Sequence, residues 1–234
     1  MSGPPESRPK SRAVALSATW LFEAGAGVYR WFTAQSAWRR SCAGLASRLP
    51  PADGIRIVDL GCGPGNSTAG LALERPDARL VGLDVARRML RYARRDGSRS
   101  PWGDRVAWVQ ADAARLPLRS ASVDAVTGHS FLYLVADREA VLAETLRVLR
   151  PGGRLVLMEP SARPATIRSV LDVSHDLRHL IAIGLWRPFS RLHGRHDAAS
   201  LAATLERSGF VRCQVEETLG GLGLLASGER PAAG

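Results

Sequence analysis

The sequence contains few cysteines and no long apolar run. Its three cysteines, Cys42, Cys62 and Cys213, have no paired spacing. This argues against a disulfide framework or a CxxC zinc site and suits a reducing cytoplasm. No stretch approaches the ~20 apolar residues of a membrane span. The first residues resemble a signal peptide in outline, but the apolar part is short and its continuation favours an amphipathic helix. We therefore expect a cytoplasmic protein.

Lysine is almost absent as well, because Lys10 is the only one. The net charge of +10 and the isoelectric point of about 10.9 therefore come from arginine. Such a charge points to acidic partners, namely nucleic acid or an anionic membrane that the protein contacts peripherally. Richness in arginine and alanine is equally typical of a GC-rich genome, so both interpretations stay open. The 234 residues suffice for one domain with a real core.

Strand and helix signals alternate after residue 54, which indicates a parallel sheet with helices on both faces. We expect strands at 55–60, 79–83, 105–109, 123–128 and 154–159, and helices at 67–74, 86–95 and 137–149. A helical stretch at about 164–194 and a helix at 198–207 follow. Two closing strands, at 209–218 and 221–227, are expected around a tight turn. The predicted fold is α/β, Rossmann-like and doubly wound, with a mostly parallel sheet of seven strands.

The domain organisation follows from these signals. Residues 1–12 are polar and rich in proline, which predicts a disordered tail. Residues 13–50 are rich in aromatic side chains and form an expected N-terminal helical lid or cap. The main domain is expected over 51–227, with a helical insert at the acceptor site over 161–197. Residues 228–234 are expected to form a frayed tail.

The segment VDLGCGPGNST (58–68) places three glycines between a buried strand and a helix. Gly61, Gly63 and Gly65 allow a sharp turn and a close ligand approach, and Asn66, Ser67 or Thr68 can cap the helix. The segment lacks the lysine of a phosphate-binding P-loop. The dinucleotide fingerprint GxGxxG also fails by one place. What remains is GxGxG after Asp59, whose carboxylate disfavours a pyrophosphate and favours a cationic ligand.

Two further carboxylates follow the next two strands. Asp84 ends one strand and can accept hydrogen bonds from both hydroxyls of a ribose. Asp112 ends the following strand, where it can accept a hydrogen bond from an exocyclic amine. Together with Asp59 they suit a cationic ligand that contains a ribose and an aminopurine and no phosphate.

Five segments together resemble a known family: VDLGCGPGNST, LVGLDVARRML, VQADAARLPL, VDAVTGHSFLYLV and LRVLRPGGRLVLMEP. In this order and spacing they resemble a class I S-adenosylmethionine-dependent methyltransferase of the small-molecule type (methyltransferase type 11, quinone-biosynthesis-like). The resemblance implies S-adenosyl-L-methionine as cofactor and S-adenosyl-L-homocysteine as product. It also implies that Asp84 holds the ribose, that Val85 and Met89 pack on the adenine, and that Asp112 meets its N6 beside Ala113. The methionine end would meet Asp59, Gly61, Cys62, Gly63, Gly65, the backbone of His129, and Tyr29 of the leading helix.

The catalytic groups are less clear, because an in-line displacement at a sulfonium methyl needs mainly alignment and exclusion of water. His129 is a candidate base, although its backbone alone could matter. His175 and His179 share a helix face at i, i+4. With a later HxxH they could bind zinc, one could act as a base, or both could be ordinary helix residues. We expect no metal.

The leading hypothesis is methyl transfer to a small, hydrophobic acceptor. A phospholipid N-methyltransferase at the membrane surface is one alternative, and a non-catalytic cofactor-binding module is another. An RNA-directed enzyme is suggested by charge alone. The motif [DNS]PP[FYW], usual in enzymes that methylate base amines, is missing after the fourth strand, so nucleic acid is not the expected partner. The sequence does not indicate an oligomeric state.

Overall fold

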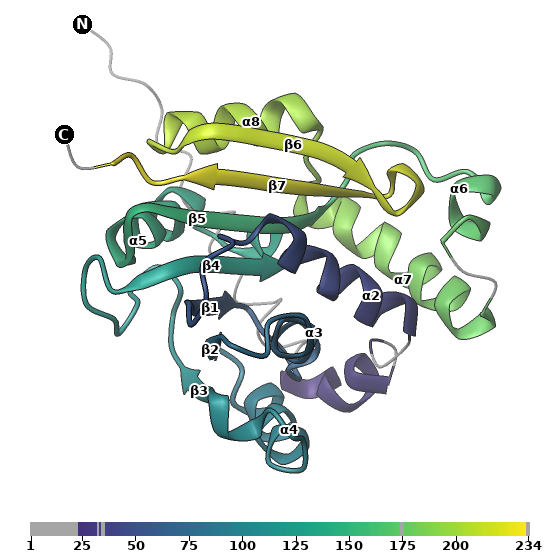
Figure 1. The fold of residues 1–234 in the computed structure, drawn as a ribbon. Helices are drawn as coiled ribbons and strands as arrows, with labels where there is room; N and C mark the ends of the chain where they lie inside the picture. The colour runs from purple at the N-terminus through teal and green to yellow at the C-terminus, as the bar shows by residue number, and fades with distance from the viewer. Residues whose placement is uncertain (1–22, 32, 34–35, 174–175, 233–234) are drawn as a thin grey trace, which may run out of the picture.

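The computed structural model describes residues 23–31, 33, 36–173 and 176–232. Within them, seven strands form one sheet in the order β3-β2-β1-β4-β5-β7-β6. Strands β1 to β5 are parallel, whereas β7 runs antiparallel to both β5 and β6. The predicted seven-stranded, mostly parallel fold is confirmed (Figure 1). The strands are β1 (Arg56–Leu60), β2 (Arg79–Asp84), β3 (Val106–Gln110), β4 (Val123–His129), β5 (Leu149–Pro160), β6 (Val211–Thr218) and β7 (Gly223–Glu229).

Helices cover both faces of this sheet. They include α2 (Ser36–Gly44), α3 (Asn66–Glu74), α4 (Arg87–Gly97), α5 (Arg138–Val148), α6 (Ile167–Leu171), α7 (Leu177–His193) and α8 (Ala198–Arg207). Residues 23–31 are also helical. The short 3-10 helices are η1 (Leu45–Arg48), η2 (Gly103–Arg105), η3 (Leu132–Leu134) and η4 (Leu219–Gly221). None of the described helices has the length and apolar character needed to cross a bilayer.

Strand β1 shows why the buried strands are apolar without alternation. Ile57 and Val58 are both fully buried, although neighbouring side chains on a strand point to opposite faces. Ile57 packs in one core with Leu71 of α3, and Val58 packs in another with Leu142 of α5. A central parallel strand covered on both faces is therefore apolar at successive positions, and its one buried polar residue, Asp59, is hydrogen-bonded.

The structure corrects three boundaries. Strand β5 begins at Leu149, so the RPGG segment at 150–153 lies inside a strand whose pairing with β4 shifts register. Strand β7 ends at Glu229, and Arg230 still exchanges backbone hydrogen bonds with Gly152 and Gly153. The expected tail therefore starts too early. The expected helical stretch at 164–194 is two helices, α6 and α7. The expected tail at 1–12 lies outside the described residues.

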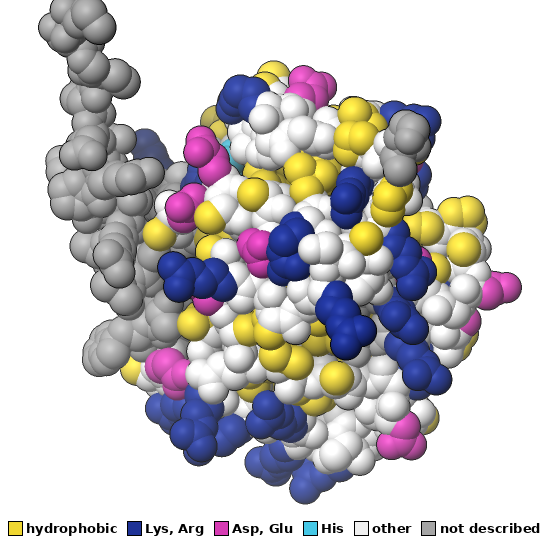
Figure 2. Space-filling view, turned by 90° about the vertical axis from the view of Figure 1, so that its left-hand side faces the viewer, with side chains coloured by type: hydrophobic (Ala, Val, Ile, Leu, Met, Phe, Trp, Pro, Cys, Tyr) yellow, Lys and Arg dark blue, Asp and Glu magenta, His cyan; other side chains and the backbone are white. Residues whose placement is uncertain are grey.

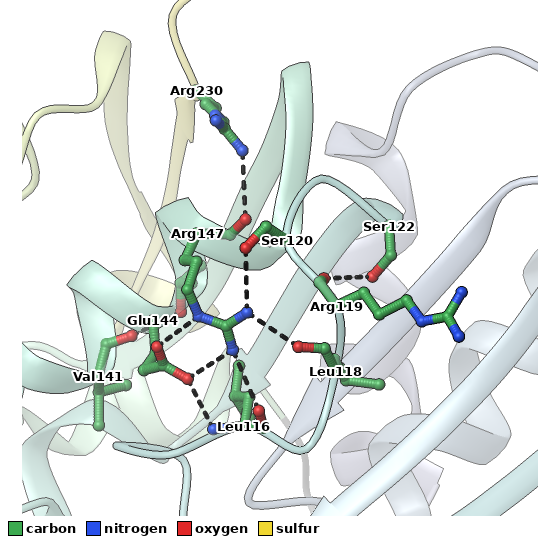
Figure 3. A network of polar contacts seen from close by, with 10 residues as sticks. Leu116, Leu118, Arg119, Ser120, Ser122, Val141, Glu144, Arg147 and Arg230 are labelled. Atoms are coloured by element: carbon green, nitrogen blue, oxygen red, sulfur yellow. Dashed lines mark hydrogen bonds and ion pairs between the residues drawn. The ribbon is translucent and has the colours of Figure 1, made fainter.

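The loop after β3 is held against α5 by Arg147 (Figure 3). Its guanidinium pairs with Glu144 at 2.6 Å and donates to the carbonyl oxygens of Leu118 at 2.9 Å and Leu116 at 3.1 Å. The other carboxylate oxygen of Glu144 accepts from the Leu116 amide at 2.8 Å. Because this loop leads from Asp112 back to β4, the network fixes one wall of the cavity described below.

The face at the amino ends of the parallel strands is basic. In Figure 2, Lys and Arg side chains spread over this face with fewer acidic ones between them, and they gather at its lower end, at the height of α4. The sequence of α4 contains five arginines, all exposed: Arg87, Arg88, Arg91, Arg94 and Arg95.

Candidate functional site

A cavity of about 390 Å³ opens at the carboxyl ends of β1, β2 and β4. This is where the strand order reverses, since β1 lies between β2 and β4. Open α/β sheets bind ligands at such a switch point, and cavities of this volume hold small molecules. Residues from the helical lid, the glycine loop and the ends of three strands line it, among them Tyr29, Gly61, Gly63, Asp84, Val85, Met89, Asp112, Ala113, His129, Phe131 and Leu134.

The glycine loop reaches this cavity through two of its three glycines. At Gly61 a Cβ atom would lie 2.3 Å from Cδ2 of Phe131, so only glycine fits beneath that ring. Gly63 has φ of +55° and lies beside Tyr29. Gly65 does not line the cavity. A Cβ atom there would lie 2.9 Å from the Trp108 ring, so this glycine lets α3 pack closely.

Asp84 supplies the one carboxylate that is both buried and in the cavity wall. It is 9% exposed, and its two oxygens accept from the backbone amides of Gly63 at 2.8 Å and Ala86 at 2.7 Å. Burial raises the pKa of this carboxyl, although the two amides oppose that shift. Each oxygen keeps a further lone pair, so the group can still accept hydroxyl donors from a ligand.

Two more acidic residues, Asp112 and Asp137, line the cavity, and Asp112 lies at the exposed end of the loop after β3. Its Oδ1 accepts from the Ala114 amide at 2.9 Å. Met89 is buried and Val85 is half exposed at the rim, so an apolar slot lies between Asp84 and Asp112. A flat, apolar ring system with polar edges would fit this arrangement of groups.

Asp59 does not line this cavity, and its predicted contact with the methionine end is not seen in the structure and stays a prediction. It is fully buried, and hydroxyls donate to it from Ser67 at 2.6 Å, Thr68 at 2.6 Å and Thr127 at 2.9 Å. Burial raises its pKa to about 6. Ser67 and Thr68 therefore anchor α3 to β1 and do not cap the helix, whose N-cap is Gly65.

The predicted contact of Cys62 is not seen either. Cys62 is buried outside the cavity lining, and its amide donates to the Leu83 carbonyl oxygen at 3.0 Å, which ties the loop to β2. The three predicted carboxylates, Asp59, Asp84 and Asp112, thus do not all line one cavity. Two of them face the cavity, and the third holds the loop from beneath.

The helical lid closes one side. Tyr29 lines the cavity, and burial is the main reason that its pKa is raised. The next residue, Arg30, pairs with Asp96 of α4 at 2.9 Å and lies 5.3 Å from the Tyr92 ring. These contacts fix residues 23–31 against α4 and place the tyrosine ring over the glycine loop. The part of the expected lid at 13–22 lies outside the described residues.

His129 ends β4 between this cavity and a smaller one of about 30 Å³. Its Nε2 lies 3.0 Å from the Ser41 hydroxyl, which donates to the Trp38 carbonyl oxygen at 2.7 Å. A hydroxyl has one proton, so we assign the Nε2–H tautomer, in which the imidazole donates to Ser41. Burial lowers the pKa of His129 to about 4, so the ring is uncharged at neutral pH.

The smaller cavity is mainly apolar and lies under α2 and α7. Its lining comprises Trp38, Ser41, His129, Ser130, Met158, Glu159, Val173, Ala182, Ile183, Trp186, Leu219, Leu222 and Gly223. None of these described residues is lysine or arginine. The cavity therefore has no cation to neutralise a carboxylate or phosphate.

Glu159 is a structural group that the sequence did not reveal. It is 1% exposed, and its carboxylate accepts from the backbone amides of Phe131, Leu132 and Tyr133 at 2.7–3.2 Å. Burial raises its pKa to about 7. The carboxylate thus fixes the turn that carries Phe131 into the main cavity. An acidic residue at the end of an apolar strand was the only available signal.

The other candidate histidines remain predictions. His175 lies outside the described residues, as does the side chain of His179. Among the side chains that the structure describes, no group of three or more histidines, cysteines and acidic residues is placed to hold a metal ion.

A family model described as "Methyltransferase domain" matches residues 58–157. A demethylmenaquinone methyltransferase of Clavibacter sepedonicus is 35% identical over 193 residues, which are 79% of this chain and 77% of that protein. The chain belongs to the class I S-adenosylmethionine-dependent methyltransferases. The predicted enzyme class and cofactor are confirmed with it.

Two further proteins are similar to this methyltransferase. A trans-aconitate 2-methyltransferase of Azoarcus sp. (strain BH72) is 41% identical over 164 residues, or 70% of this chain and 58% of that protein. The chain thus spans less than two thirds of that relative's length. The crystal structure of the [4+2]-cyclase SpnF has a TM-score of 0.71 at 16% identity and full coverage of both chains. That likeness shows the fold.

Proposed function

We propose that this methyltransferase transfers a methyl group to a small, uncharged and largely apolar acceptor that enters the smaller cavity with its reacting end only, because about 30 Å³ holds a group of a few atoms. The observation that carries the proposal is the lining of that cavity, which joins two tryptophans and aliphatic side chains to His129 and Ser41. Desolvating an ionised acceptor there would be costly, because no described lining residue carries a compensating positive charge.

The main cavity fits the cofactor of the family. The Asp84 carboxylate suits the ribose hydroxyls, and the slot between Val85, Met89 and Ala113 suits the adenine, with Asp112 at its polar edge. Tyr29 and the backbone around Gly61 and Gly63 would lie at the methionine end. S-adenosylmethionine, when bound, supplies an electrophilic methyl group.

The residues of the chain then mainly align the acceptor with the methyl group and take little part in proton transfer. His129 lines both cavities, and its bond to Ser41 fixes the plane of the imidazole at the passage between them. Its pKa near 4 disfavours an imidazolium, so we assign it the role of orienting the acceptor. Phe131 and Tyr29 would exclude water from the reacting atoms.

The test is an acceptor series with radiolabelled S-adenosylmethionine. We expect label transfer to apolar hydroquinones, the class to which the acceptor of the Clavibacter relative is chemically close, and none to trans-aconitate, a tricarboxylate. Preferential labelling of trans-aconitate would overturn the assignment of acceptor class. Tight cofactor binding without transfer to any acceptor would instead indicate a binding module.

A further inference from the structure

Helix α7 is apolar on its outer face as well as its inner one. Leu177, Ile181 and Leu185 are four residues apart, share one side of the helix, and are 69%, 45% and 60% exposed. On the inner side Ile183 is 9% exposed and lines the smaller cavity. A surface helix of a water-soluble protein normally presents polar residues outward, so this outer face calls for a partner.

The helix at 23–31 extends the same surface. Val28 is 63% and Trp31 is 53% exposed. Arg178 of α7 lies 4.2 Å from the Trp31 ring and donates to the Trp31 carbonyl oxygen at 2.6 Å. In Figure 1 the two helices lie side by side at the lower right, at the carboxyl ends of the parallel strands. We call the five exposed side chains the apolar rim: Val28, Trp31, Leu177, Ile181 and Leu185.

The charges around the apolar rim are mainly positive. Helix α7 contains no acidic residue. Helix α4 packs against the helix at 23–31 and begins beside the main cavity with the exposed Arg87 and Arg88, whereas its later arginines lie toward the amino ends of the strands. The one acid of α4, Asp96, is paired with Arg30. Three acidic residues belong to the helix at 23–31 or to the segment just before α7: Glu23, Asp172 and Asp176. Positive charge beside exposed leucine, isoleucine and tryptophan matches an anionic headgroup layer over acyl chains.

We infer that the apolar rim docks on an anionic bilayer, with Arg87 and Arg88 in the first turn of α4 facing the headgroups. The rim covers both cavities from outside, because Tyr29 on one helix and Ile183 on the other line them. Docking would therefore bring the acceptor entrance to the lipid. This surface assignment goes beyond the proposed function and does not depend on it, since its test measures binding.

The experiment is co-sedimentation of the full chain with vesicles. We expect binding to vesicles of phosphatidylcholine with one third phosphatidylglycerol, weakening as salt is raised, and little binding to phosphatidylcholine alone. Leu185→Glu should weaken binding about tenfold, because it places a charge where the rim enters the bilayer. The matched control is Leu73→Glu, since Leu73 is 63% exposed, close to the 60% of Leu185, but lies in the last turn of α3 and does not belong to the rim.

Three results would overturn the inference. The first is wild-type protein that stays in the supernatant with anionic vesicles. The second is equal weakening by Leu185→Glu and Leu73→Glu, which would mean that net charge alone decides binding. The third is a lower molecular mass for Leu185→Glu than for wild type when both are sedimented without vesicles. That result would make the rim an interface between copies of the chain.

Discussion

The imidazole of His129, which lines both cavities, and the hydroxyl of Ser41, which lines the smaller one, meet at 3.0 Å. The residues are 88 positions apart in sequence and come from β4 and α2. This contact couples the end of a core strand to the helical lid. It also engages the Nε2 nitrogen of the ring.

Removing the serine hydroxyl tests this coupling. We expect Ser41→Ala to lower kcat/KM about three- to tenfold, the usual worth of a neutral hydrogen bond, with cofactor affinity unchanged. Ser47→Ala is the matched control, because Ser47 is exposed on η1 and bonds only to the Gly44 carbonyl oxygen. His129→Ala should reduce turnover further while the cofactor still binds. Equal activity of wild type and Ser41→Ala would refute the orienting role.

The assignment of the main cavity to the cofactor depends on Asp84. Asp84→Asn should weaken S-adenosylmethionine binding by about 1–3 kcal/mol in calorimetric titration, because it removes a charge-assisted acceptor. Asp104→Asn on the exposed η2 helix is the control and should leave the affinity as it is. An unchanged affinity in Asp84→Asn would show that the ribose lies elsewhere.

The glycine loop offers a pair of substitutions that separates strain from steric overlap. Gly54 and Gly61 have φ of +67° and +62°, but a Cβ atom meets nothing within 4 Å at Gly54 and meets Phe131 at 2.3 Å at Gly61. Gly54→Ala should cost about 1 kcal/mol of unfolding free energy. Gly61→Ala should cost about 1–3 kcal/mol more and should also weaken cofactor binding, since Phe131 must move. Urea denaturation of both variants measures the difference.

The raised pKa of Glu159 predicts that the free energy of unfolding depends on pH. Its folded-state pKa, about 7, lies above its ordinary value of 4.5, so the folded protein holds a proton that the unfolded chain has lost. This group therefore lowers stability as pH rises from about 4.5 to about 7. Glu159→Gln removes the titration, so the variant should gain on the order of 3 kcal/mol relative to wild type over that range.

The comparison with Glu159→Gln cancels the contributions of other groups. His129 and His196 have pKa values lowered to about 4 by burial, so they favour the folded state more as pH rises toward 6.5. Only the difference between wild type and variant isolates Glu159. A difference that stays constant with pH would mean that this carboxyl titrates normally.

Much of the fold could be predicted from local pattern. The apolar run of β1, the glycines after it and the alternation of strands and helices are short-range signals, and the structure places them where the sequence predicted. The anchoring of Asp59 in the core was not foreseen, because its third hydroxyl donor, Thr127, is 68 positions away on β4. Glu159 was missed for the same reason, since its three amide donors belong to the turn after another strand.

The anchoring of Asp59 has a further consequence. Because three hydroxyls hold this carboxylate in the core, the shape of the glycine loop is set before any ligand arrives, and binding there involves little loss of backbone entropy. Selectivity among acceptors must then be governed by the segments that close over the loop. Evolution of a new acceptor preference within this scaffold would accordingly proceed by changing helix 23–31 and α7, with the nucleoside pocket left untouched.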